Sequence, residues 1–252
     1  MRRALLALPF LALMLGFASA STRADEAPPL SEKQQEAVKK LVHDYLMEHP
    51  EAVMEALQAF REKERLAEEE SAKKAMAQRA DELNHDPNSV VFGNPEGDVT
   101  VVEFFDYHCP YCKAMIDSVL ETVNNDGKVR LVMKELPILG PDSVYAARAA
   151  IASRKQHLYP EFHKALMHLK GPLNENSVMQ TAASVGLNVD QLKQDMDDKE
   201  VESIISANMN LARAIKVDGT PGWVVGDKLT SGAMSPQAFK QLIEDARKPK
   251  SG

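Results

Sequence analysis

The chain has 252 residues, of which 44% are hydrophobic and 27% are charged, and its formal net charge is −7 at pH 7. This composition excludes a wholly disordered chain and a collagen-like repeat, and two cysteines are too few for a disulfide-rich miniprotein. The acidic balance argues against nucleic-acid binding, which needs a basic face to neutralise phosphates. The length allows one large domain, or one domain with an appended segment.

The N-terminus predicts a secretory signal peptide at residues 1–20. Two arginines precede an apolar run over residues 4–17, and small residues follow it; this order is typical of an exported protein. The preferred cleavage site follows Ala20, and a poorer second site follows Ala24. The run is shorter than the ~20 residues that span a membrane, and an uncleaved anchor is the alternative. Export implies an oxidising compartment, most simply a bacterial periplasm.

Residues 30–84 predict a helical arm in front of the main domain. Apolar residues recur at helical spacing over residues 38–46 and 53–60, and Pro50 separates the two stretches. Ten of the fifteen residues at 61–75 are charged, so this segment is expected to stay outside any core, as a solvated helix or a hinge. Isolated short helices are marginal in water. We therefore expect the apolar stripe to pack against the same arm of another subunit; the alternative is an arm that folds back on its own main domain.

Both cysteines stand in the tetrapeptide Cys109-Pro110-Tyr111-Cys112. Two intervening residues close too small a loop for a disulfide to stabilise the fold much, so the pair is better suited to being formed and broken. A structural Zn²⁺ site needs four ligands, and the seven histidines offer no such set at suitable spacing. We therefore expect no metal at this motif.

A strand and a helix are predicted on either side of the cysteines. Residues 98–105 form a β-branched and aromatic run typical of a buried strand, and residues 113–123 carry apolar side chains at helical spacing. This order places Cys109 at a helix N-terminus, where unpaired N–H groups and the helix dipole favour a thiolate, the attacking species in disulfide exchange. Cys112 follows about one turn later, beneath the surface, where it can resolve a mixed disulfide.

The remaining segments predict an α/β fold whose mixed sheet is interrupted by a helical insertion over about residues 142–212. Residues 128–136 predict another strand, and a closing hairpin is expected around Gly226 and Asp227. Asp142 is a candidate N-cap of the first inserted helix. Helical patterns lie at 142–154, 160–169, 176–185, 190–196, 203–217 and 235–246.

Two segments closely resemble the DsbA-like, thioredoxin-fold thiol:disulfide oxidoreductases. They are Val102-Glu103-Phe104-Phe105-Asp106-Tyr107-His108-Cys109-Pro110-Tyr111-Cys112-Lys113 and Gly219-Thr220-Pro221-Gly222. The resemblance covers about residues 90–247 and implies a thioredoxin-like sheet. It also implies a cis peptide bond between Thr220 and Pro221, beside the active-site disulfide; an ordinary trans turn proline is the alternative. The Thr220 backbone is then free to pair with an extended substrate.

Glu103 lies six residues before Cys109 in an otherwise apolar strand. Burial would raise the pKa of this carboxyl, so that it could carry a proton near neutrality. In the resembled family an acidic residue at this place is thought to assist proton transfer to the buried cysteine. The alternative is an outward-facing Glu103 that pairs with Lys134.

Three residues beside the sulfurs are expected to tune them. His108 could support a thiolate when protonated, or it could be a loop side chain in water. Strongly oxidising members of the family place His between the cysteines, whereas this chain has Pro110 and Tyr111, and tyrosine cannot carry a positive charge. Glutaredoxins share this dipeptide and have reduction potentials of about −200 to −230 mV, whereas the strong oxidant of the resembled family lies at about −120 mV. We expect a reduction potential between these limits.

The predicted function is thiol:disulfide interchange on the cysteines of exported proteins in the periplasm, with no cofactor beyond the redox-active disulfide. ScsC-like and related proteins carry an N-terminal helical extension that in some members makes trimers. The resemblance therefore implies an oligomeric isomerase or reductase, maintained by a DsbD/ScsB-like membrane reductant. One alternative is a monomeric DsbA-like dithiol oxidase with a DsbB-like oxidant. An alternative of another class is a non-enzymatic chaperone that binds client proteins.

Overall fold

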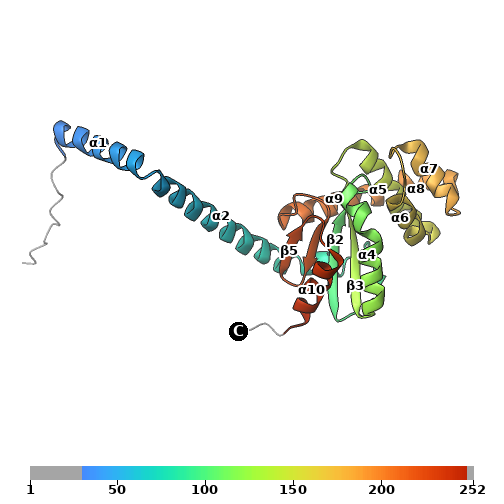
Figure 1. Ribbon diagram of the computed structural model, residues 1–252. Helices are drawn as coiled ribbons and strands as arrows, with labels where there is room; N and C mark the ends of the chain where they lie inside the picture. The colour runs from blue at the N-terminus through green and yellow to red at the C-terminus, as the bar shows by residue number, and fades with distance from the viewer. Residues whose placement is uncertain (1–29, 249–252) are drawn as a thin grey trace, which may run out of the picture. The chain divides into compact units, whose positions relative to one another are not determined.

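The structure is a computed structural model that describes residues 30–248, so the predicted signal peptide lies outside the described residues (Figure 1). The chain forms two compact units, and the boundary between them falls between Ala59 and Phe60. The elements are, in chain order, α1 (Glu32–Glu48), α2 (Pro50–Gln78), α3 (Ala80–Asn84), β1 (Val90–Gly93), β2 (Val99–Phe105), α4 (Pro110–Asp126), β3 (Val129–Glu135), α5 (Pro141–Ser153), the 3₁₀ turn η1 (Arg154–Gln156), α6 (Tyr159–Met167), α7 (Glu175–Ser184), α8 (Val189–Met196), α9 (Lys199–Ala214), β4 (Gly222–Val225), β5 (Lys228–Ser231) and α10 (Pro236–Arg247).

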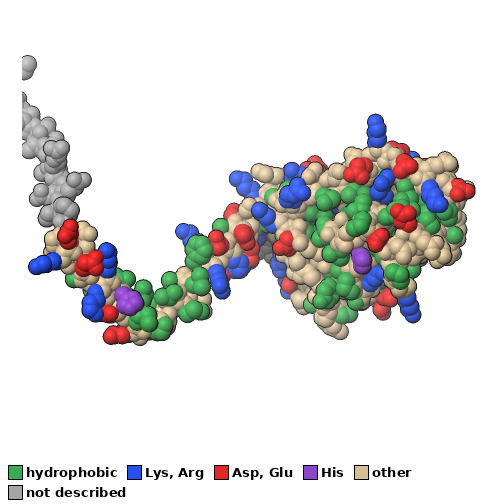
Figure 2. Space-filling model, turned by 90° about the horizontal axis from the view of Figure 1, so that it is seen from above, with side chains coloured by type: hydrophobic (Ala, Val, Ile, Leu, Met, Phe, Trp, Pro, Cys, Tyr) green, Lys and Arg blue, Asp and Glu red, His purple; other side chains and the backbone are tan. Residues whose placement is uncertain are grey.

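The N-terminal unit consists of α1 and the first part of α2. Gln34 closes the start of α1, because its Oε1 accepts a hydrogen bond of 2.9 Å from the Ser31 backbone N–H. Helix α1 ends at Glu48, because His49 precedes Pro50 and the residue before a proline disfavours the helical conformation. The large apolar side chains of this unit are exposed in the single chain, and Figure 2 shows hydrophobic side chains gathered along this segment. They are Leu30, Val38, Leu41, Val42, Tyr45, Leu46, Met47, Val53, Met54 and Leu57.

The charged segment is a helix whose far end packs into the second unit. Residues 61–75 are helical, but Ala72 and Met76 are buried, at 6% and 4% exposure. The expectation that this segment stays outside any core is therefore wrong at Ala72. Residues 72 and 76 are one helical turn apart and share a face, so small and apolar side chains on that face pack while the charged faces stay in water.

The second unit is built on a five-stranded mixed sheet in the order β1-β3-β2-β4-β5. Strands β2 and β3 are parallel, and the other neighbouring pairs are antiparallel. The sequence analysis missed β1, a short edge strand. Its end at Gly93 is fixed by crowding, because a Cβ there would lie 2.5 Å from the Val129 carbonyl oxygen.

Successive residues of each strand face opposite sides of the sheet, and each side has its own core. One side includes Phe105, Met133 and Trp223 and packs against α4 and α10. The other side includes Phe104 and Val132 and packs against α9 and the short helix α3. Helix α4 and the C-terminal part of helix α9 are therefore on opposite faces of the sheet.

The insertion between β3 and β4 contains α5 to α9, as predicted, with two corrections at helix starts. Gly140, not Asp142, is the N-cap of α5, and Pro141 occupies the first turn. Helix α9 begins at Lys199, four residues earlier than predicted, because the Asp198 side chain caps it by accepting from the Glu200 N–H at 3.0 Å. Within residues 30–248, none of the helices is both long and apolar enough to span a membrane.

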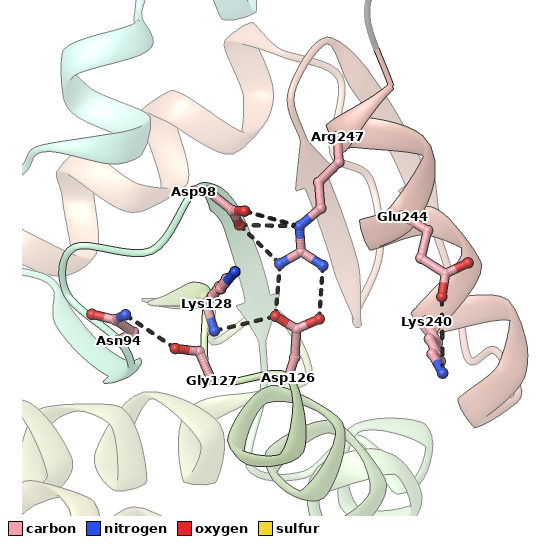
Figure 3. A network of polar contacts seen from close by, with 8 residues as sticks. All are labelled: Asn94, Asp98, Asp126, Gly127, Lys128, Lys240, Glu244 and Arg247. Carbon is pink, nitrogen blue, oxygen red and sulfur yellow. Dashed lines mark hydrogen bonds and ion pairs between the residues drawn. The ribbon is translucent and has the colours of Figure 1, made fainter.

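Arg247 ties the last helix to the base of the sheet. Its guanidinium lies between Asp126, which ends α4, and Asp98, which precedes β2 (Figure 3). The closest contacts are 2.6 Å to Asp126 Oδ1 and 2.8 Å to Asp98 Oδ1. This two-carboxylate arrangement uses the fork geometry of arginine and fixes the C-terminal end of α10.

Candidate active site

The two cysteines lie at the start of α4, where the sequence placed them. Cys109 is the N-cap residue, in an extended conformation, and Pro110 occupies the first turn. Both cysteines are free thiols and both are buried, with exposures of 3% for Cys109 and 1% for Cys112. Pro110 and Tyr111 between them are exposed, and 61% of Tyr111 is accessible. The dipeptide therefore forms the surface above the two sulfurs.

The downstream Thr220-Pro221 segment meets the motif. The peptide bond between these residues is cis, as the resemblance implied, and the alternative of a trans turn proline is wrong. The Cys109 thiol donates a hydrogen bond to the Thr220 carbonyl oxygen, with 3.2 Å between Sγ and O. Residues more than a hundred positions apart in the chain therefore form one surface around Cys109.

Glu103 is buried on the α4 side of the sheet, beneath Cys112. It stands opposite Met133 and Trp223 in the strand register, and it is 3% exposed. Burial raises the pKa of this carboxyl to about 8, and its Oε2 has no hydrogen-bond partner in the described part of the chain. Burial, with the Glu103 charge as a second cause, raises the pKa of the Cys112 thiol above its ordinary value.

The alternative pairing of Glu103 with Lys134 is wrong. Lys134 follows Met133 on β3 and so points to the opposite face of the sheet. Its ammonium donates to Asp86 Oδ2 at 2.7 Å. Glu103 therefore faces the cysteines while Lys134 faces α9.

Asp106 holds the loop that carries Cys109, and the sequence analysis assigned it no role. Its Oδ2 accepts from the backbone N–H groups of Ile138 and Leu139 at 2.9 and 3.0 Å. Its Oδ1 accepts from the His108 N–H at 2.7 Å. These bonds join the cysteine loop to the loop after β3, so Asp106 is a positioning residue. The His108 side chain itself is exposed to solvent.

A buried polar network joins the cysteine loop to helix α6 of the insertion. Glu135 Oε1 accepts from the Tyr159 hydroxyl at 2.6 Å and from the Tyr107 hydroxyl at 3.2 Å. Tyr107 in turn lies 2.9 Å from His163 Nδ1. Burial raises the pKa of Glu135 to about 8 and lowers the pKa of His163 to about 3. His163 is therefore neutral, and the Nδ1–H tautomer donates to Tyr107.

This network has only a weak signal in the sequence. Glu135 is an acidic residue at the end of an apolar strand, the same kind of exception that drew attention to Glu103. Tyr159 and His163 are four residues apart and so share a helix face, but they could not be matched to a distant strand without the tertiary structure.

The fold, with two buried cysteines at the start of α4, is that of a thioredoxin-like protein. Residues 100–244 match the model of the DSBA-like thioredoxin domain, so the chain belongs to that family. Residues 34–67 match a second model, the copper resistance protein ScsC N-terminal domain.

Two solved structures show the likeness. A thioredoxin-like oxidoreductase from Silicibacter pomeroyi is 48% identical, with a TM-score of 0.65, over 67% of this chain and 98% of that one. Proteus mirabilis ScsC in a transitional conformation is 27% identical, with a TM-score of 0.64, over 86% of this chain and 98% of that one.

Curated relatives match part of the chain. The thiol:disulfide interchange protein DsbA of Bordetella parapertussis is 28% identical over 167 residues, which are 60% of this chain and 78% of that protein. A Na⁺/H⁺ antiporter NhaA of Salinispora tropica is also 28% identical, but the match spans only 24% of its length.

Proposed function

We propose that the protein is an exported thiol:disulfide interchange protein of the periplasm that acts on cysteines of other exported proteins. The observation that carries the proposal is the position of Cys109. It caps α4 with its sulfur 3.2 Å from the Thr220 carbonyl oxygen. A thiolate at this place is favoured by the N-terminal end of the helix, and the neighbouring backbone can pair with an extended client chain.

The reaction needs only the two cysteines and the client disulfide. The Cys109 thiolate attacks one client sulfur, which forms a mixed disulfide and releases the other client sulfur as a thiolate. If Cys112 then attacks Cys109, the client leaves reduced and the Cys109–Cys112 disulfide forms. If a client thiolate attacks the mixed disulfide instead, a new client disulfide forms and Cys109 returns as a thiolate. The second route is isomerisation and consumes no electrons.

Glu103 is the proposed proton carrier for Cys112. Burial raises the pKa of the Cys112 thiol, so this sulfur needs a base before it can attack. Glu103 is close enough for its charge to affect Cys112, and the pKa of its carboxyl of about 8 allows proton exchange near neutrality. Exchange by Glu103→Gln that is as fast as wild type across pH 5 to 8 would remove this role.

The N-terminal stripe supports an oligomer. Ten large apolar side chains of residues 30–57 are exposed in the single chain, and a stripe of this kind is stable in water only when something covers it. A second copy of the same arm fits, because it offers the same apolar face. Several active sites in one particle raise the local concentration at which a released client thiol meets another cysteine pair. This favours the isomerase or reductase, with a DsbD/ScsB-like membrane reductant as its partner.

Refolding of a scrambled-disulfide substrate tests the interchange function. Because the chain has only two cysteines, each single serine variant reports one thiol. Cys109→Ser should abolish refolding, whereas Cys112→Ser should still form mixed disulfides and accumulate them. Refolding that persists in Cys109→Ser would support a chaperone that binds clients without chemistry.

Sedimentation of the mature chain tests the oligomer. The comparison uses a truncated chain that lacks the arm and begins at Phe60. A deletion through residue 84 would also remove Met76 and Leu83, which are buried in the second unit. Leu41→Gln should weaken assembly, since Leu41 is 68% exposed in the stripe, and Lys40→Gln is the matched control on the same helix. A full-length monomer that oxidises dithiols but does not isomerise would favour the DsbA-like oxidase.

A further inference from the structure

A cavity of about 360 Å³ lies on the side of the sheet away from the cysteine helix. Helix α3, the loop at residues 85–88, strand β3 and helix α9 surround it. Leu211 in its lining belongs to the core that includes Val132, and Ile204 belongs to the core that includes Cys112. Neither the two cysteines nor Glu103, Thr220 or Pro221 line the cavity. The cavity is therefore separate from the proposed redox site.

Two polar side chains line this cavity at positions where the pattern calls for apolar residues. Helix α9 buries a stripe of Val201, Ile204, Ile205, Leu211 and Ala212, and Asn208 lies within that stripe. Strand β3 turns Val132 and Lys134 to the same face, because they are two residues apart. Lys134 and Asn208 line the same cavity and are only 1% and 3% exposed.

The Asn208 side chain makes no hydrogen bond within residues 30–248, and the residue is only 3% exposed. Its amide is not among the fully enclosed polar atoms without a partner, so it is accessible from the cavity that it lines. Most buried polar side chains in proteins are hydrogen-bonded, so this amide is available to a ligand. The Lys134 ammonium has three donors and one protein partner, Asp86 at 2.7 Å. The inner wall thus keeps hydrogen-bonding capacity that the protein itself does not use.

The mouth of the cavity carries an excess of negative charge. Four carboxylates line it, and they are Asp81, Glu82, Asp86 and Glu200. Two of them are neutralised, because Asp86 pairs with Lys134 and Glu82 pairs with Arg79 at 3.0 Å. Asp81 and Glu200 have no ion-pair partner in the part of the chain that the structure describes. Anionic ligands are repelled by this arrangement, and cations are attracted.

The lining also contains aliphatic surface from Ile204, Ala207 and Leu211, which suits the methylene stem of a long cationic side chain. A metal ion fits poorly, since no group of three metal-ligating side chains occurs within residues 30–248. A planar guanidinium or an ammonium can instead donate to the two free carboxylates and to the Asn208 carbonyl oxygen.

We propose that this cavity is a second binding site, which takes an ammonium or guanidinium group carried on an aliphatic stem. Asp81 and Glu200 bind the charge, Asn208 accepts one hydrogen bond deeper inside, and the α9 side chains cover the stem. The source is either an arginine or lysine side chain of a polypeptide or a free polyamine, and both offer this chemistry.

Calorimetric titration of the full mature chain tests the site, with N-acetyl-arginine amide as the polypeptide probe and putrescine as the free amine. N-acetyl-citrulline amide is the control ligand, because it keeps the shape of arginine and lacks the charge. A dissociation constant of about 1 mM is expected for a ligand of this size. Binding of the arginine probe alone identifies a polypeptide side chain, and binding of putrescine alone identifies a free polyamine.

Two variants locate the binding. Asn208→Leu restores the apolar stripe and should fold, yet it should weaken binding at least about tenfold, and Glu200→Gln should weaken it about threefold or more. Glu202→Gln is the matched control, since Glu202 is exposed on the same helix and does not line the cavity. Equal binding of the citrulline probe, unchanged binding by folded Asn208→Leu, or no saturable heat with either cation would overturn the proposal.

The redox assay separates this site from the proposed function. Asn208→Leu lies on the opposite face from Cys109, so refolding of the scrambled substrate should stay at the wild-type rate while binding is lost.

Discussion

Replacing Glu103 by glutamine should change the pH dependence of stability in a way that burial alone predicts. The pKa of Glu103 is about 8 in the folded protein, whereas its ordinary value, which applies to the unfolded chain, is 4.5. The folded state therefore holds this proton more tightly than the unfolded chain. The contribution to stability is lost as the pH rises from 4.5 to about 8, because the unfolded carboxyl ionises and the folded one does not.

The magnitude follows from the separation of the two values. A pH of 7 lies about 2.5 units above the pKa of the unfolded carboxyl, and this difference corresponds to about 3 kcal/mol of lost stability. At pH 5 the loss is below about 1 kcal/mol. Glutamine has no proton to lose. The stability of Glu103→Gln relative to wild type should therefore rise by about 2 to 3 kcal/mol between pH 5 and pH 7, whatever constant penalty the buried amide adds.

Urea denaturation of the reduced protein at pH 5, 6, 7 and 8 measures this difference. Glu121→Gln is the matched control, because it removes the same charge from an exposed position on α4. A difference between Glu103→Gln and wild type that stays constant across this pH range would refute the argument that Glu103 is buried and protonated in the folded state.

Three further substitutions test the surrounding structure. Tyr159→Phe removes the 2.6 Å bond to Glu135 and should destabilise the fold by about 1 to 3 kcal/mol in urea denaturation; because that bond lowers the pKa of Glu135, the loss should grow from pH 6 to pH 9, and a pH-independent loss would contradict it. Asp106→Ala leaves the backbone N–H groups of His108 and Leu139 without their partner, whereas the Ile138 N–H keeps its bond to the Leu136 carbonyl oxygen. The substitution should therefore cost about 2 to 4 kcal/mol and slow disulfide exchange; an unchanged exchange rate would show that the loop does not depend on Asp106. Arg247→Ala should cost about 1 kcal/mol, since the Arg247 side chain is 29% exposed and its partners Asp98 and Asp126 are 50% and 18% exposed. This cost should shrink in 1 M NaCl, and a loss that does not change with salt would contradict the explanation by ion pairs.

Local patterns in the sequence were sufficient to predict much of the main domain. The β-branched run before Cys109 and the helical spacing after Cys112 depend only on neighbouring residues, and they predicted β2 and α4 to within a residue or a few. The same holds for the inserted helices and for the hairpin around Gly226. The cysteine spacing indicated a redox pair, because a disulfide that closes so small a loop would stabilise the fold only slightly.

Other features depended on contacts between distant segments. Strand β1 is four residues long and carries no periodic signal of its own. The charged helix α2 buries Ala72 only because its far end meets the core of the second unit. Which face Glu103 and Lys134 occupy was decided by the register of β2 against β3, since a shift of one residue exchanges the two faces.

The sequence by itself predicted most of the elements and the place of Cys109 at a helix N-terminus, because both depend on adjacent residues. Only the tertiary structure decided what those residues meet. It placed Thr220 against Cys109, joined Glu135 to Tyr159, and brought Asn208 and Lys134 to the lining of one cavity. The first of these contacts joins residues 111 positions apart in the chain, and the second joins residues 24 positions apart. The physical reason is that burial of a polar side chain depends on the complete packing of sheet and helices around it.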